Sequence, residues 1–298
     1  MFWLVLGWWL APAGSAPAQG LPREAIGAFQ FPDHLVPVID GDLSEWGVVD
    51  PEYVIATERF TDLVDGVDPG GQTGDFSVRL MVGWNRAANQ LYVAARVVDD
   101  VHQIDRPPGT AAVQIFMDDA VEVFVDADHS GGQYADFADL SPEEQLRRNG
   151  AEASQFVIAG PPPDADFFVN FSAAGWYSLP EGPYTAAAYA VSEAAGGSSV
   201  VTYEMKLTPF DHIHMQAPFL SYEHSMEEGQ VLGFNVEFDD YDRFSELLDA
   251  KWSLSGGYNA YKFSERFADL RLMPLEGRFQ PSAVWRLSWG RLKSSFAP

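Results

Sequence analysis

The segment VRLMVGWNRAANQLYVAARV, residues 78–97, decides the fold class of this chain. In residues 78–84 every second side chain is apolar, and residues 91–97 repeat this pattern. Such alternation is typical of β-strands that bury one face, whereas an amphipathic helix repeats every roughly 3.6 residues. The intervening residues 85–89, NRAAN, are typical of a turn. The segment therefore predicts a β-hairpin with one face in a hydrophobic core.

Further strand patterns follow along the chain, separated by glycine, proline and aspartate. They are residues 121–125, 167–171, 184–191, 200–207, 231–238 and 267–272. Many short strands with turn residues between them favour antiparallel sheets in a sandwich or a barrel. We expect an all-β fold: an antiparallel β-sandwich of two sheets, of the jelly-roll or immunoglobulin-like kind, with loop insertions and one short helix.

The short helix is predicted inside a long excursion between strands, residues 136–153. Ser141 can cap its first turn, the proline after it suits the first helical position, and Glu144 completes a capping box. Gly150 is a typical helix end.

A second long excursion, residues 208–229, carries three of the six histidines. His212 and His214 are two residues apart, so a strand would put both imidazoles on one side, as half of a metal site. The alternative is that both lie on a surface loop.

Composition and charge narrow the classes of function. The chain has 298 residues with 43 acidic and 18 basic side chains, a formal net charge of −25 at pH 7. We expect no nucleic-acid partner, because that affinity comes mainly from Lys and Arg against phosphates, and an anionic membrane surface is disfavoured for the same reason. The 47% hydrophobic content is enough for a core. The absence of cysteine excludes disulfides, Cys-ligated zinc and thiol chemistry.

The two ends of the chain differ from its middle. Residues 2–10, FWLVLGWWL, are apolar, and APA at residues 16–18 is typical of a signal-peptide cleavage site. The apolar run is shorter than the about 20 residues that span a bilayer. We expect a signal peptide at residues 1–18, no membrane span, and a secreted or periplasmic protein. One domain is expected over residues 30–275, followed by a C-terminal tail at 276–298 that is either a docking element or a signal for another protein.

Carboxylates gather at the ends of several predicted strands. Asp126, Asp128 and Ser130 stand at alternate positions just before two glycines, so a curling loop could aim their oxygens at one point. Asp99 and Asp240 belong to further acidic clusters. Calcium prefers about six to eight oxygen ligands, and close like charges repel without a cation or solvent between them. These residues predict a structural calcium site, with a solvated acidic face as the alternative.

Several motifs in order resemble the family 9 carbohydrate-binding module and its DOMON-like β-sandwich relatives. They are VIDGDLSEW at residues 38–46, VGWNRAANQLYVAARVVD at 82–99, DAVEVFVD at 119–126, YEMKL at 203–207, LGFN at 232–235 and ADLRL at 268–272. The resemblance spans residues 36–273. It implies a secreted β-sandwich with structural calcium, which holds a sugar end between two aromatic rings with polar side chains around it.

The resemblance also implies which residues would bind the sugar. One ring of the family site lies shortly before the VEVFVD strand, where this chain has Phe116. The other lies shortly before the closing LRL strand, where Tyr261 falls, or Tyr258 if the register slips. Glu122 matches a polar residue of the family pattern. Both rings are smaller than the tryptophans typical of the family, and residues 155–158, QFVI, lack the arginine typical of that stretch.

We therefore expect a non-catalytic carbohydrate-binding domain, an accessory to glycan degradation. The sequence has no G-x-S-x-G, H-E-x-x-H, P-loop or dinucleotide-binding motif. Two alternatives stay open. One is a cell-surface or secretion-linked sandwich without sugar binding. The other is a haem-binding electron-transfer relative, with axial ligands from Met117, His102, and Met205 or Lys206.

Overall fold

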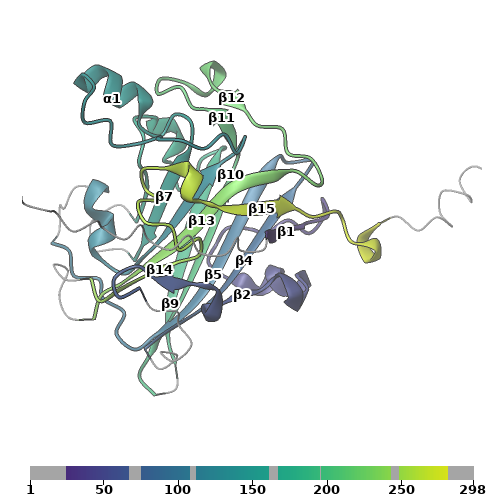
Figure 1. The fold of residues 1–298 in the computed structure, drawn as a ribbon. Coiled ribbons are helices and arrows are strands. Elements are labelled where there is room, and N and C mark those ends of the chain that lie inside the picture. The colour runs from purple at the N-terminus through teal and green to yellow at the C-terminus, as the bar shows by residue number, and fades with distance from the viewer. Residues whose placement is uncertain are drawn as a thin grey trace, which may run out of the picture.

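The computed structural model describes residues 25–66, 75–107, 112–160, 167–194, 196–242 and 248–280. Within them the chain folds into two β-sheets packed face to face, with long excursions gathered at one end (Figure 1). The predicted signal peptide, residues 1–18, and residues 281–298 of the predicted tail lie outside the described residues. None of the helices in the described ranges is long and apolar enough to cross a membrane.

The two sheets are built from antiparallel pairs. Sheet A consists, in spatial order, of β8 (Phe168–Asn170), β7 (Ser154–Ala159), β6 (Ala120–Asp126), β13 (Val231–Asp240) and β15 (Ala268–Leu272), with β14 (Ala250–Ser253) also beside β13 and β3 (Thr61–Asp62) beside β14. Sheet B consists of β9 (Thr185–Glu193), β10 (Ser199–Leu207), β5 (Gln90–Asp99) and β4 (Phe76–Asn85), with β2 (Ile55–Ala56) beside β4. This arrangement confirms the predicted antiparallel sandwich.

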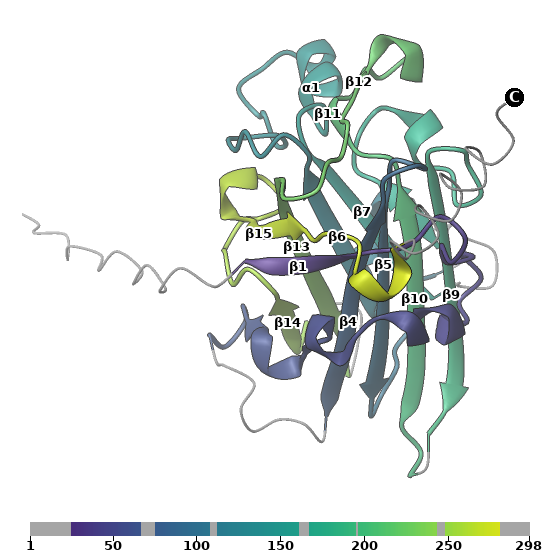
Figure 2. The same ribbon diagram turned by 90° about the vertical axis from the view of Figure 1, so that its right-hand side faces the viewer.

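One strand, β1 (Ile26–Gln30), joins the two sheets. Its first half pairs with β15 of sheet A, where Ile26 lies opposite Leu270. Its second half pairs with β4 of sheet B, where Gln30 lies opposite Trp84. Figure 2 shows β1 running between β15 and β4. This strand was not predicted from the sequence, and its two parallel pairings are the exception to the antiparallel pattern among the described strands.

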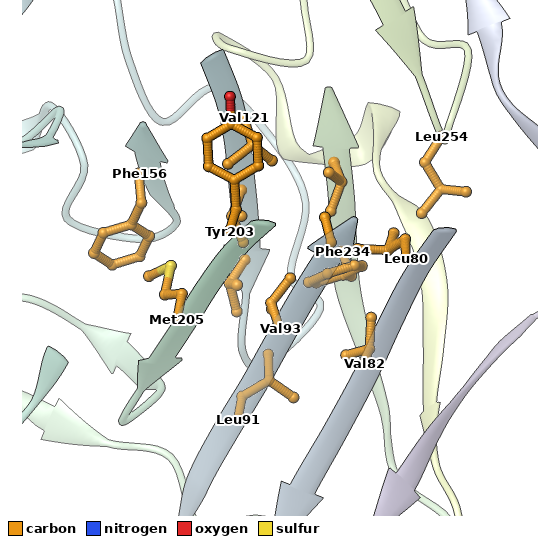
Figure 3. Close-up of a cluster of buried hydrophobic side chains, with 14 of the residues drawn as sticks. Leu80, Val82, Leu91, Val93, Val121, Phe156, Tyr203, Met205, Phe234 and Leu254 are labelled. Atoms are coloured by element: carbon orange, nitrogen blue, oxygen red, sulfur yellow. The ribbon is translucent and has the colours of Figure 1, made fainter. Parts of the chain in front are cut away.

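The predicted hairpin is formed by β4 and β5, with Val82 opposite Val93. Both side chains are buried in the main core cluster. Val121 and Phe234, which come from the facing sheet, belong to the same cluster (Figure 3). The alternating pattern thus buries one face of each sheet against the other, which is the main apolar contribution to the stability of a sandwich.

The other predicted strands are also present, as β6, β8, β9, β10, β13 and β15. β7 and β14 were not predicted from the sequence. Every residue of β7, SQFVIA, is buried, so its two faces do not alternate between apolar and polar, and periodicity cannot distinguish such a run from a buried helix. β14 has only four residues.

The predicted helix is α1 (Pro142–Arg148). The Ser141 hydroxyl accepts the Glu144 backbone N–H, which confirms Ser141 as the cap. The Glu144 carboxylate Oε2 accepts this hydroxyl at 2.9 Å, rather than the Ser141 backbone N–H of a full capping box. Gly150 has a φ of +71°, and a Cβ added there would lie 2.5 Å from the Cβ of Ser172. Both conditions require glycine at this position.

The second excursion forms a small separate sheet of β11 (Phe210–His212) and β12 (Tyr222–Glu223). Both views show it beside α1 (Figures 1 and 2). Short 3-10 helices occupy other connections: η1 (Leu43–Val48), η2 (Pro51–Tyr53), η3 (Thr57–Arg59), η4 (Ala112–Met117), η5 (Gly175–Tyr177), η6 (Pro218–Leu220), η7 (Ser264–Arg266) and η8 (Gly277–Phe279).

Candidate functional site

The outer face of sheet A, the side turned away from the core, carries a row of polar side chains. On β6 the alternation puts Val121 and Val123 in the core and Glu122 and Phe124 on the opposite face. Neighbouring strands add to this row because residues opposite each other in antiparallel strands share a face. We call the row the polar strip; its members are Glu122, Gln155, Asn235, Glu237, Asp239, Lys251 and Ser253.

Lys251 joins three carboxylates of the polar strip. Its Nζ lies 2.8 Å from Glu122 Oε1 and 2.6 Å from Asp239 Oδ1. The third contact, to Glu237 Oε2, is longer at 3.4 Å. The other carboxylate oxygen of Glu122, Oε2, accepts from Gln155 Nε2 at 2.7 Å. Both oxygens of Glu122 therefore have partners within the protein.

One ammonium among three buried carboxylates determines which groups of the strip are charged. Burial alone would lower the pKa of Lys251, but the surrounding carboxylates raise it well above its ordinary value. Burial raises the pKa of Asp239 well above its usual range and raises that of Glu237. Burial would also raise the pKa of Glu122, but the Lys251 charge and hydrogen bonds lower it. Lys251 is thus the cation of the strip, and of its three carboxylates Glu122 is the one whose charged form the surroundings favour.

An apolar cluster borders the polar strip at the start of β6. Ile115 of η4 packs there with Ala120. The next residue, Phe116, has its ring 6.3 Å from that of Phe171, and its backbone oxygen accepts from the Tyr241 hydroxyl at 3.1 Å. The Phe116 side chain is 41% exposed. The first predicted ring therefore lies beside the strip and is open to solvent.

A second apolar cluster borders the polar strip at the end of β6. Phe124 packs there with Tyr134. The buried Tyr134 hydroxyl donates to the Ala260 backbone oxygen at 2.9 Å, and burial, followed by the carboxylates of the strip, raises the pKa of Tyr134. Tyr261, next to Ala260, is 47% exposed, and Tyr258 is 56% exposed. The second predicted ring, in either register, is also open to solvent.

The predicted ligand residues lie on one side of sheet A but differ in accessibility. The structure does not bring Phe116 and Tyr261 together: Phe116 lies beside the start of β6, and Tyr261 follows Ala260 beside its end. Glu122 is only 4% exposed. The Lys251 side chain reaches further toward solvent, with 21% exposed. Lys251 was not predicted from the sequence as a site residue. One feature of the sequence marks this residue: Lys251 is one of four lysines in an acidic chain, and its neighbours in the segment AKWSL are mostly apolar.

A different group of carboxylates lies where β5 and β13 end. Asp99, Asp240 and Asp242, which we call the acidic centre, each have a carboxylate oxygen within 4.8 Å of the other two. Asp99 is 3% exposed and Asp240 is 2% exposed. Burial, together with repulsion from neighbouring carboxylates, raises the pKa of Asp99 to about 8, of Asp240 to about 7 and of Asp242 to about 6. His102 and Asp119 form an adjoining group with Asp99.

The donor set of the acidic centre fits a hard divalent cation. Buried oxygens Oδ1 of Asp240 and Oδ1 of Asp242 have no hydrogen-bond partner within the described residues. Carboxylate oxygens without donors, gathered at one point, are the ligands that calcium prefers. The residues that could hold a calcium ion here are Asp99, Asp240 and Asp242.

The other predicted calcium ligands lie at the opposite end of β6. Backbone N–H groups hold their carboxylates: that of Ser130 donates to Asp126 Oδ1 at 3.2 Å and to Asp128 Oδ1 at 3.1 Å. The N–H of Gly131 donates to Asp126 Oδ2 at 2.8 Å. The structure therefore separates the predicted metal ligands into two groups, and calcium at either group stays a prediction.

The residues considered for haem do not surround a common space. The cavity that adjoins His102 has a volume of about 10 Å³, which is room for a water molecule rather than a haem. His102 Nδ1 lies 3.1 Å from Asp119 Oδ2. Met205 is buried in the core, Lys206 points to the other face of β10, and Met117 ends η4 beside the polar strip.

His212 and His214 line the same pocket, but each ring nitrogen Nδ1 has its own partner. That of His212 is 2.8 Å from Glu152 Oε1. That of His214 accepts the backbone N–H of Gln216 at 3.3 Å. These partners do not indicate a shared metal ion.

Comparisons with known proteins agree with this architecture. Residues 47–143 match the family model described as "Carbohydrate family 9 binding domain-like". This match confirms the resemblance that the sequence motifs predicted. No curated protein matches the chain.

Two solved structures share the fold. A family 9 carbohydrate-binding module from Caldicellulosiruptor kristjanssonii in complex with cellotriose superposes with a TM-score of 0.53 at 13% identity, over 87% of this chain and 98% of that chain. A family 9 module from the same organism in complex with glucose superposes with a TM-score of 0.50 at 14% identity, over 87% of this chain and 100% of that chain. These likenesses confirm the all-β sandwich.

Proposed function

We propose that this chain is a carbohydrate-binding domain that holds a saccharide on the outer face of sheet A, between Phe116 and Tyr261. The observation that carries this proposal is a polar strip bordered at both ends by exposed aromatic side chains. Flat rings pack on the C–H faces of sugars, while charged and amide groups bond the hydroxyls. The family 9 modules that share the fold are complexes with cellotriose and with glucose, so these two sugars are the first probes.

In this proposal Glu122 positions Lys251, and Lys251 meets the sugar. The two oxygens of Glu122 already have partners at 2.8 and 2.7 Å. The contact from Lys251 Nζ to Glu237 is the longest of its three, at 3.4 Å. A sugar oxygen could replace Glu237 as the acceptor for Lys251 Nζ at a small cost in binding free energy, because a hydrogen bond of this length is weak.

The test is titration calorimetry of the full chain with cellotriose and with glucose. We expect Phe116→Ala and Tyr261→Ala each to weaken cellotriose binding by about fivefold or more, taking about 1–3 kcal/mol for a ring that stacks on its ligand, as for stacked bases. Tyr258→Ala tests the alternative register of the second ring.

The matched control is Phe219→Ala, which removes a side chain that is 84% exposed on the β11–β12 excursion. Binding should be unchanged in this variant. Absence of binding to both sugars and to a glycan array would favour the sandwich without sugar binding. Binding that survives the loss of both Phe116 and Tyr261 would contradict the proposed site.

We also propose that the acidic centre binds a structural calcium ion. Support comes from its buried all-oxygen donor set and from the orphan Oδ1 atom of Asp240. Calcium would replace repulsion among carboxylates with attraction, and so hold the ends of β5 and β13 together. A calcium-dependent melting temperature is the measurement that tests it.

The same proposal includes an exported protein that acts without catalysis, as an accessory to glycan degradation. It is supported by the family 9 resemblance and by the signal-like pattern of residues 2–10 and 16–18. N-terminal sequencing of the exported protein should show that it begins after residue 18. Incubation with cello-oligosaccharides should release no shorter product. A protein that keeps residues 1–18 would contradict export. Release of shorter sugars would contradict the absence of catalysis.

A further inference from the structure

A pocket of about 410 Å³ is lined by residues of both long excursions. Figures 1 and 2 show the elements of these excursions, α1 and the β11–β12 sheet, side by side. The first excursion supplies Phe137, Arg147 and Arg148 to its lining. The second excursion supplies His212 and His214. The volume is within the range of small-ligand sites, about 300–1,000 Å³.

Backbone contacts hold the two walls of this pocket together. The N–H of Ile213 donates to the Ala151 oxygen at 2.7 Å, so the second excursion is fixed to the end of the first. Gly150 N–H donates to the Tyr134 oxygen at 2.9 Å. The indole N–H of Trp176 donates to the His214 oxygen at 3.1 Å. The pocket is therefore a built feature of the fold, because three separate segments are tied together around it.

Two guanidinium groups line the pocket without a close carboxylate partner. Arg148 lies over the Phe137 ring, 4.4 Å from its centre, and has no ion pair within the part of the chain that the structure describes. Arg147 has only a 3.8 Å contact with Glu144, with both side chains largely exposed, which is a weak interaction. In a chain of net charge −25 these groups make a local positive site.

The remaining polar groups do not cancel this charge. Glu152, the one carboxylate among the described lining residues, is held by His212 Nδ1 at 2.8 Å. His214 Nδ1 accepts the Gln216 N–H, so its other nitrogen, Nε2, is a donor. The Tyr222 ring is 69% exposed and lies 5.9 Å from the His212 ring. The pocket thus combines donors for an anion with an exposed ring beside it.

We propose that this pocket binds a saccharide that carries a carboxylate, that is, a uronic acid residue. Arg147 and Arg148 would bond the carboxylate, since a guanidinium matches its geometry with two parallel hydrogen bonds. A bare anion such as phosphate would fill only a small part of 410 Å³. The choice of a saccharide over another carboxylate rests on the proposed carbohydrate-binding function; the pocket itself is separate from the polar strip.

The experiment is titration calorimetry of the full chain with digalacturonic acid and with its neutral dimethyl ester. We expect the acid to bind at least about tenfold more tightly than the ester and to lose affinity as salt is raised. Arg148→Gln should remove this preference. Arg96→Gln, which removes the same charge from the exposed face of β5, should leave it unchanged.

Three results would overturn the inference: equal affinity for acid and ester, a preference that survives Arg148→Gln, or displacement of the sugar by an equal concentration of inorganic phosphate. Cellotriose binding, measured on the same samples, tests the proposed function separately. Loss of cellotriose binding in Phe116→Ala with an unchanged acid preference would support two independent sites. Unchanged melting temperatures of the variants ensure that folded protein is compared.

Discussion

The polar strip and the acidic centre are built from the same kind of group, the buried carboxylate, but they differ in charge balance. In the polar strip Lys251 lies within 2.8 Å of two carboxylates and 3.4 Å from a third. In the acidic centre, Asp99 and Asp240 form no salt bridge with a cation inside the described ranges. The first cluster has one cation, supplied by the chain itself, for three carboxylates. The second has none and must hold protons or take a cation from solution.

The two clusters therefore affect the stability of the fold in different ways. A compensated cluster is part of the folded structure, and its cost appears only when the cation is removed. An uncompensated cluster makes stability depend on solution conditions, namely pH and divalent ions.

Lys251→Met should destabilise the protein by about 3–5 kcal/mol, because it leaves Glu122 and its neighbours buried without a cation. Urea denaturation measures the change. Lys262→Met is the control, since Lys262 forms an exposed pair with Asp136 at 2.6 Å and should have little or no effect. Similar stability of the two variants would show that the strip is not held together by Lys251.

Stability without calcium should fall as pH rises between about 4 and 8. Asp99 and Asp240 bind protons more tightly in the folded state, with pKa values of about 8 and about 7, than in the unfolded state. Each retained proton makes the free energy of unfolding drop by about 1.4 kcal/mol per pH unit until the folded-state pKa is passed, or roughly 3 kcal/mol from pH 5 to 7.

The pH prediction is checked by denaturation in chelator at several pH values. Asp99→Asn removes one of the titrating groups and should flatten the slope. A slope of the opposite sign in the unmodified chain would contradict the protonated state of the acidic centre.

Calcium should raise the melting temperature near neutral pH, by the equivalent of about 2.7 kcal/mol at a hundred times the dissociation constant. Asp240→Asn should remove most of this response and should stabilise the calcium-free protein, because it relieves repulsion. An unchanged melting temperature in calcium and in chelator would exclude a structural ion at this centre.

Asp128→Ala should have the smallest effect, within about 0.5 kcal/mol, and should leave the calcium response intact. Its carboxylate accepts one backbone N–H, that of Ser130, at 3.1 Å. A lost calcium response in this variant would move the ion from the acidic centre to the opposite end of β6.

The fold was predictable where a strand has one buried face. β4 and β5 alternate clearly, so the hairpin and its core residues follow from the sequence. β7 has both faces buried, and its run of apolar residues therefore lacks a period. β1 could not be predicted, because the parallel pairings that make it a strand join segments far apart in the chain.

The candidate site was predictable only in part. Phe116 and Tyr261 came from the family resemblance, and both lie beside the polar strip. Lys251 was missed because its partner Glu122 is 129 residues away, and no local pattern marks such a contact. Asp99 and Asp240 were each identified as acidic, but their contact depends on where β5 and β13 end.

The strands with one buried face, the short helix and the excess of acid groups follow from the sequence alone, because they depend on neighbouring residues and on composition. The packing of distant segments selects which carboxylates receive a cation, which receive backbone donors and which receive neither. The physical reason is that the charge state of a buried group depends on burial and on charges a few ångströms away, and those neighbours come from distant parts of the chain.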